Sequence, residues 1–137
     1  MIKDIVRDPV FLGHASREAV PEDYWIADDL SDTLMAHRER CVGMAANMIG
    51  QWVRIIVILC QGKPMVMINP VIEKTVGKPY ETEEGCLSLP GERKTKRFSK
   101  IQVSFLDRQG KKKIRTFNGF EAQIVQHEID HCNGILI

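Results

Sequence analysis

The chain has no excess of charge of either sign and no long apolar run. Its 137 residues carry 19 Lys and Arg against 18 Asp and Glu, a formal net charge of +1 at pH 7. So small a charge creates no field that would recruit nucleic acid or an anionic membrane. No segment approaches the roughly 20 consecutive apolar residues that cross a bilayer, and the opening MIKDIVRDPV lacks a signal-peptide pattern. We therefore expect a cytoplasmic protein that contacts neither membrane nor nucleic acid directly.

The chain also lacks the cysteine pattern of small secreted proteins. Its cysteines form no C-x-x-C pair and have no even spacing: they are Cys41, Cys60, Cys86 and Cys132. Such a pattern is not typical of a disulfide scaffold, so we expect reduced thiols. No internal repeat or low-complexity linker is visible, and a chain of this length can bury a sizeable core. The sequence therefore predicts one domain that spans residues 1–137.

Apolar spacing predicts a helix from Pro21 to Arg40. Its buried stripe would contain residues three and four positions apart: Tyr24, Ala27, Leu30, Leu34 and His37. Acidic residues come early in this segment and basic residues late, which suits the helix dipole. We treat the following segment around Gly43 as a loop.

Strand-like segments occupy the middle of the chain. RIIVILC and PMVMINPVI are separated by a short turn at Gln61–Lys63, which predicts a hairpin. Alternating apolar residues predict a third strand from Ile101 to Asp107, and a turn then leads to a fourth strand near Ile114 to Phe117. Two basic clusters, residues 93–100 and 111–113, are interpreted as solvated edges and turns.

A second helix is predicted from about Gly119 to His131, capped by Asn118 and followed by Gly134. One of its faces would contain Phe120, Ile124, His127 and His131. Antiparallel strands with helices before and after them indicate an α+β fold, in which strands pack around a buried C-terminal metal-binding helix and one helix lies near the N-terminus.

The sequence QHEIDH places two imidazoles on one face of this last helix. His127 and His131 are four residues apart, so both can bind one ion. Glu128 lies one residue further round, where its carboxylate can accept a proton from water at the ion. The alternative is a pair of buried core histidines with a solvent-facing Glu128.

Two histidines need a third protein ligand to hold a catalytic ion. The six residues after His131 include no histidine and no carboxylate, so the ligand must come from upstream. Cys86 is the best candidate, because Gly85 allows close approach and a thiolate binds Zn²⁺ or Fe²⁺ strongly. We expect a short apolar strand, ended by Pro90, to follow it. An inert buried Cys86 is the alternative, and the competing ligands are His14, His37, Cys41 and Cys60.

Three stretches in this order, CVGMAANMIG, EGCLSLP and QHEIDH, resemble the signature motifs of the peptide deformylase family. The opening, with Asp8 and Pro9, is also similar, and the likeness covers nearly the whole chain. The resemblance implies a cytoplasmic hydrolase that removes the formyl group from the N-terminal formyl-methionine of nascent polypeptides, working close to the ribosome, and releases formate. It implies Fe²⁺ as the native metal, which Zn²⁺ or Ni²⁺ can replace, with Cys86, His127 and His131 as ligands.

The resemblance also assigns roles in catalysis and substrate binding. Glu128 would accept a proton from water and return it to the leaving amine, and the Leu87 backbone amide would stabilise the developing oxyanion. The peptide would bind as an extended strand beside Gly43 and the residues after Cys86.

Other matched positions would complete the site. The methionine side chain would enter an apolar pocket lined by Ile124 and Phe120. Glu84 is a candidate hydrogen-bond partner for a ligating histidine.

The first motif departs from the family pattern, Gly-x-Gly-x-Ala-Ala-x-Gln. Cys41 replaces the first glycine, and Met48 replaces a glutamine that normally donates a hydrogen bond to the oxyanion. Losing one such donor can cost roughly 100- to 1,000-fold in rate. Weaker turnover, or altered specificity for the acyl group or the N-terminal residue, is therefore an expectation for this chain. The alternative functions are a catalytically weak or silent paralogue that binds metal and blocked N-termini or inhibitors, and a general metallo-endopeptidase.

Overall fold

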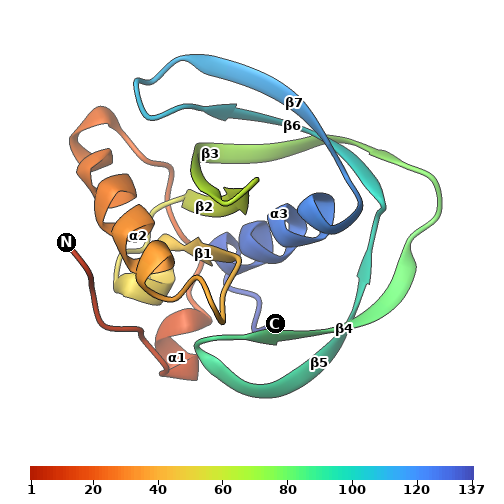
Figure 1. The fold of residues 1–137 in the computed structure, drawn as a ribbon, viewed down its shortest axis with the longest axis horizontal. Helices are drawn as coiled ribbons and strands as arrows, with labels where there is room; N and C mark the ends of the chain where they lie inside the picture. Colours follow the sequence, from red (N-terminus) through yellow and green to blue (C-terminus); the bar gives the residue numbers. More distant parts are fainter.

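Two antiparallel sheets surround the C-terminal helix in the computed structural model, which describes residues 1–137 (Figure 1). The larger sheet has the strand order β1-β2-β3-β6-β7, and the smaller one pairs β4 with β5. The strands are β1 (Gly43–Ala45), β2 (Ile55–Cys60), β3 (Lys63–Val76), β4 (Tyr80–Cys86), β5 (Leu89–Arg97), β6 (Lys100–Leu106) and β7 (Lys112–Asn118).

Three α-helices accompany the sheets. They are α1 (Pro9–Leu12), α2 (Trp25–Ala36) and α3 (Gly119–Cys132), and two short 3₁₀ turns cover Pro21–Asp23 and Ala46–Ile49. None of these helices has the length and apolar character that a bilayer span requires.

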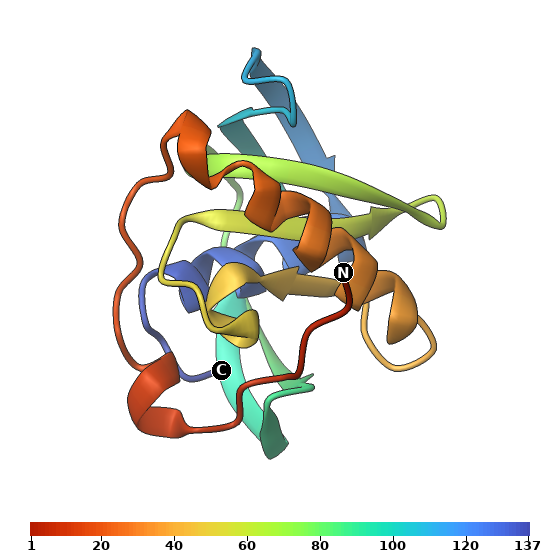
Figure 2. The ribbon, with the colours of Figure 1, turned by 90° about the vertical axis from the view of Figure 1, so that its left-hand side faces the viewer.

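Helices α2 and α3 cover opposite faces of the larger sheet (Figures 1 and 2). Alternate residues of β2 and β3 point to opposite faces, as the pleat of a strand requires. Those packed in the α2 cluster are Ile55, Val57 and Ile68, and those in the α3 cluster are Ile56, Ile58 and Met67. All six are fully buried. The central strands are therefore apolar on both faces, and this explains their continuous apolar runs.

Helix α3 lies between the larger sheet and the β4–β5 hairpin (Figure 1). Nine of its 14 residues are buried. The predicted α+β fold, with antiparallel strands around a buried C-terminal helix, is confirmed. The predicted hairpin is confirmed as β2–β3, and the two later strands are confirmed as β6 and β7.

Several boundaries differ from the sequence prediction. Helix α2 ends at Ala36 rather than Arg40, because the chain leaves helical geometry at His37 (φ −111°), which is only half-buried. Asn118 occupies the N-cap position of α3, but its side chain makes no capping hydrogen bond. The region around Gly43 was predicted to be a loop and forms the short strand β1 instead.

The predicted short strand after Cys86 was wrong. Cys86 ends β4, a tight turn follows, and Pro90 lies inside β5. Proline is tolerated there because Pro90 has no partner in β4: the register shifts between the pairs Gly85–Glu92 and Cys86–Leu89, so the missing N–H costs no ladder bond. Strand β5 escaped prediction because most of its residues are polar and exposed, with no apolar face to detect.

The chain after α3 turns sharply at Gly134, where φ is +74°. A Cβ atom at this position would lie 2.7 Å from the Gly13 carbonyl oxygen and 3.0 Å from the Ala15 nitrogen. Gly134→Ala therefore combines an unfavourable backbone angle with a backbone clash. We expect it to lower the free energy of unfolding by more than the roughly 1–2 kcal/mol that the angle alone costs.

Gly62→Ala is the matched control for this prediction, measured by urea denaturation. Gly62 has a similar φ of +76°, but a Cβ atom at this position would meet no other atom within 4 Å. Equal destabilisation by the two substitutions would contradict the argument from the clash.

Candidate active site and metal centre

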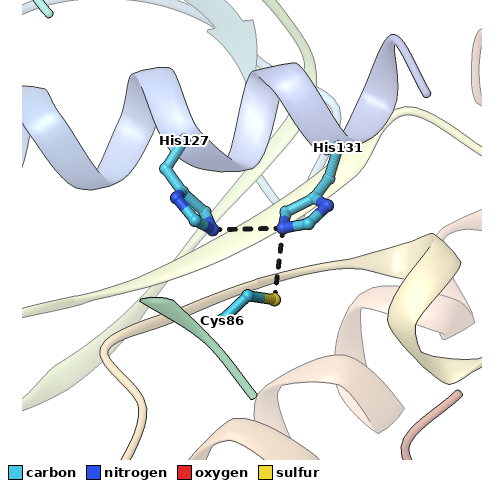
Figure 3. A group of neighbouring side chains, drawn as sticks. All are labelled: Cys86, His127 and His131. Carbon is cyan, nitrogen blue, oxygen red and sulfur yellow. Dashed lines mark hydrogen bonds between the residues drawn. The ribbon is translucent and has the colours of Figure 1, made fainter. Parts of the chain in front are cut away.

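Three side chains that could hold a metal ion meet where the end of β4 faces α3 (Figure 3). The ligand atoms of Cys86, His127 and His131 all lie within 4.8 Å of one another. The Cys86 Sγ is 3.4 Å from the His131 Nε2, which is 3.1 Å from the His127 Nε2. The two imidazoles come from successive turns of α3, as the spacing of four residues predicted.

This arrangement fits a divalent cation. Ligands of a tetrahedral zinc site, at about 2.0–2.3 Å from the ion, lie roughly 3.3–3.6 Å from one another, close to the Cys86–His131 and His131–His127 distances found here. The Nδ1 of His127 faces the Glu84 carboxylate at 2.8 Å and donates a hydrogen bond to it. Once the ring is neutral, its Nε2 presents a lone pair toward the Nε2 of His131, and a cation between them satisfies both.

A buried ionic network holds the His127 ring through its Nδ1 atom. Glu84 accepts hydrogen bonds from His127, from Gln123 Nε2 at 2.8 Å and from Arg97 Nη2 at 2.7 Å. Arg97 also donates to Asp130 at 2.8 Å. The network joins β4, β5 and α3, so it fixes the ring that faces Cys86. The interpretation of residues 93–100 as a solvated tract was therefore wrong for Arg97, which is 4% exposed because two carboxylates pair with it.

The two glutamates of this region are electrostatically distinct. Burial disfavours the charge of Glu84, but hydrogen bonds from His127, Arg97 and Gln123 outweigh it and lower its pKa to about 2. For Glu128, burial raises the pKa to about 7.

The two imidazoles also differ. Burial, and then the neighbouring His127, lower the pKa of His131 to about 3. Burial acts in the same direction on His127, but the nearby Cys86 and the hydrogen bond to Glu84 raise its pKa to about 10. An ion that binds both rings has to displace the extra proton from His127, since ligating imidazoles are neutral.

Glu128 faces β1 at very short range. A Cβ atom on Gly43 would lie 2.7 Å from the Ile124 Cγ2 and 3.0 Å from the Glu128 Oε2. Only glycine therefore allows β1 to approach α3 this closely. The other carboxylate oxygen of Glu128, Oε1, is buried and has no hydrogen-bond partner in the protein. This leaves an acceptor available beside the ligand cluster.

An open cavity of about 960 Å³ lies in front of this group, between β1, β4, the turn after β4 and α3. Most of the residues predicted for the site line it: Gly43, Met48, Cys86, Leu87, Phe120, Ile124, His127 and Glu128. His131 lies behind them and is fully buried. Ile124 is 6% exposed and Phe120 is 63% exposed, so Ile124 forms part of the wall and Phe120 part of the rim.

The competing ligand candidates lie apart from the cluster. The ring of His14 stacks on Trp52, and His37 Nδ1 bonds with the Thr33 carbonyl. Cys60 donates to the Glu121 carboxylate at 3.0 Å. Cys41 does line the cavity, but it donates to the Gly43 carbonyl at 2.9 Å, and burial raises the pKa of its thiol to about 12. All four cysteines are free thiols, as expected.

Sequence reasoning missed three polar residues of this region. Gln123 and Arg97 belong to the Glu84 network, and Arg7 lines the cavity from the N-terminal segment. Gln123 lies one turn before His127 on α3, so its spacing was a usable signal. Arg97 and Arg7 carry no such signal, because each meets the site only through tertiary contacts.

Removing the guanidinium of Arg97 leaves two carboxylates without their partner. We expect Arg97→Met to lower the free energy of unfolding by about 3–5 kcal/mol, as breaking a buried pair does. Arg108→Met is the control, because Arg108 pairs with Asp28 at 2.9 Å on the surface, where about 0–1 kcal/mol is expected. Denaturant unfolding at equal metal content measures the free energy of unfolding of both variants. An equal decrease in the two variants would refute a special role for the buried network.

Comparison with known proteins gives the family. The family model of polypeptide deformylase matches residues 6–137. A peptide deformylase of Clostridium beijerinckii is 58% identical over 137 residues, which is the full length of both chains. A peptide deformylase of Halothermothrix orenii is 40% identical over 136 residues, covering 96% of this chain and 86% of the relative.

Solved structures of peptide deformylases are also similar to this chain. A class I type b peptide deformylase from Acinetobacter baumannii, bound to Met-Ala-Ser, superposes with a TM-score of 0.88 at 28% identity, covering 99% of this chain and 97% of that one. A peptide deformylase from Thermotoga maritima gives a TM-score of 0.86 at 28% identity, covering 99% and 95% of the two chains. With a family model and a full-length relative that both match, this chain belongs to the peptide deformylase family and is an enzyme of that type.

Proposed function

We propose that this enzyme hydrolyses the N-terminal formyl group of formyl-methionyl nascent polypeptides and releases formate. The observation that carries the proposal is the meeting of Cys86, His127 and His131 beside the unpaired carboxylate oxygen of Glu128. Fe²⁺ is the proposed native ion, with Zn²⁺ or Ni²⁺ able to replace it, because thiolate and imidazole suit all three. A bound ion of this kind would supply Lewis-acid chemistry, lowering the pKa of water and polarising a carbonyl.

Glu128 is the proposed proton carrier. Its Oε1 atom is buried and unpartnered, so it can accept a proton from the attacking water as the C–O bond to the formyl carbon forms. The same oxygen then returns that proton to the amine nitrogen as the C–N bond breaks. The immediate products are formic acid and a free methionyl amine, and proton transfer between them gives formate and the methionyl ammonium, so atoms and charge balance without a further reactant.

Negative charge grows on the formyl oxygen during attack. The backbone N–H of Leu87, which follows Cys86 and lines the cavity, is the proposed donor to this oxygen. Met48 also lines the cavity and is 1% exposed, but a thioether has no hydrogen to donate. The chain therefore has one side-chain donor fewer here than the family pattern supplies.

The shape of the cavity suits a strand-like substrate. One wall of the cavity contains Gly43, where β1 begins, and the other contains Cys86, where β4 ends. An extended peptide between them can therefore form hydrogen bonds with the backbone on both sides. The methionine side chain would pack on Ile124, with Phe120 at the rim. Nascent chains close to the ribosome, in the cytoplasm, are the proposed source of substrate, as the family resemblance implies. The chain's near-zero net charge favours no direct nucleic-acid contact.

Formate release from a formyl-Met-Ala-Ser peptide tests the function, using iron-loaded enzyme prepared without oxygen. We expect the wild type to release formate, and Glu128→Gln to be slower by roughly 100-fold or more because the proton carrier is removed. Metal content has to be equal in both. A Glu128→Gln variant as fast as the wild type would overturn the assigned role, and an inactive wild type would overturn the function.

Met48→Gln belongs to the same experiment. Restoring a donor beside the formyl oxygen should raise kcat. The upper limit is roughly 100- to 1,000-fold, which is the decrease in kcat that the loss of one such donor causes. The alternative of a silent paralogue predicts no formate from the wild type while metal is still bound. The comparisons give no support to that alternative, since the family and the relatives above are named as enzymes.

Metal analysis tests the proposed ligands separately from turnover. Cys86→Ser should lose most of its bound iron or zinc, because a hydroxyl is a far weaker ligand than a thiolate. Cys41→Ser is the matched control, since Cys41 lines the same cavity and should keep its metal content. Undiminished metal in Cys86→Ser, measured by inductively coupled plasma mass spectrometry, would remove Cys86 from the site.

A further inference from the structure

We propose that Arg7 is a positioning residue, which holds the turn of Cys86, Leu87 and Ser88 in the geometry needed for catalysis. The inference rests on the proposed function and adds a residue from outside the three motifs. Arg7 lies in the N-terminal segment, 80 residues away from Leu87 in sequence, yet it lines the same cavity.

The backbone on both sides of Arg7 is fixed by hydrogen bonds. On one side, the Val6 N–H donates to the Met48 carbonyl at 2.8 Å. On the other, Asp8 is the N-cap of α1, and its Oδ1 accepts from the Val10 N–H at 3.0 Å. Arg7 is therefore held at a defined place between Met48 and α1, although its side chain is exposed.

The side chain of Arg7 has one partner in the protein. Its Nη1 donates to the Leu87 carbonyl oxygen at 2.8 Å, and the guanidinium forms no ion pair with a carboxylate. A hydrogen bond from a charged donor is stronger than one between neutral groups. The Leu87 carbonyl shares a planar peptide unit with the Ser88 N–H, and this unit is joined through the Leu87 Cα to the one that contains the Leu87 N–H. Fixing the carbonyl therefore restricts rotation about the backbone bonds of Leu87, and this helps to keep the turn, with its N–H groups, in one conformation.

The charge of Arg7 also matters at this place. Four glutamates line the cavity, Glu83, Glu84, Glu92 and Glu128, against two arginines, Arg7 and Arg40. A developing oxyanion in such surroundings needs positive charge nearby. Because Met48 cannot donate a hydrogen bond, stabilisation of the oxyanion in this chain depends more heavily on an accurately directed Leu87 N–H. Arg7 holds the turn that carries this N–H.

Steady-state kinetics with Arg7→Gln tests the inference. We expect kcat for formyl-Met-Ala-Ser to fall by about tenfold, with KM changed much less, because misplacing a donor weakens the transition state rather than substrate binding. Arg38→Gln is the matched control: Arg38 is also exposed and its Nη1 donates to one carbonyl, that of Met35, at the same 2.8 Å. It lies outside the cavity lining, so its kcat should equal the wild-type value.

Hydrogen exchange gives a second readout that needs no turnover. In Arg7→Gln the amides of residues 86–89 should exchange roughly threefold faster or more, and in Arg38→Gln they should not change. If the wild type releases no formate, the proposed function fails, while the exchange data still decide whether Arg7 fastens the turn. The inference is overturned if exchange in the turn is unchanged, or if an active enzyme shows the same kcat in both variants.

Discussion

The hydrogen bond from His127 to Glu84 is the interaction on which the rest of the site depends. It fixes the tautomer and orientation of a ring on α3, and Glu84 itself is held by Arg97 and Gln123. Burying Glu84 as an anion is costly, and only several donors at once make it tolerable. The network therefore fastens the β4–β5 hairpin, which carries Cys86, to the helix that carries the histidines.

Close approach of β1 to α3 is the second constraint. Gly43 leaves room for the Ile124 and Glu128 side chains, so the cavity has a backbone wall directly beside the carboxylate. Together the two constraints give a site with chemical groups on a rigid buried helix and substrate-facing backbone on strand ends. This division suits the hydrolysis proposed above, in which a short N-terminal segment of many different polypeptides would be recognised, because backbone hydrogen bonds are independent of sequence.

Much of the fold was readable from apolar patterns. The β2–β3 hairpin, β6 and α3 were predicted because their apolar residues pack in one of two cores on either side of the sheet, and β7 contributes Phe117 to one of these cores. Strand β5 was missed, since it pairs only with β4 and has no buried face to leave a pattern. The sequence prediction also placed the end of α2 too late. The half-buried His37 continues the three- and four-residue spacing of the buried residues of α2, although the helix itself ends at Ala36.

By itself the sequence determined which side chains form the cluster. The spacing of His127 and His131 places them on one helix face, and the motif around Cys86 resembles a known family closely enough to name Cys86 as its third member. Only the tertiary structure decided which residues surround these side chains. Arg97, which the sequence suggested to be a surface charge, is buried. Arg7, far from Leu87 in sequence, donates a hydrogen bond to the Leu87 carbonyl. The physical reason is that local spacing fixes neighbours on one helix or strand, whereas long side chains find partners that only the packing of distant segments brings within reach.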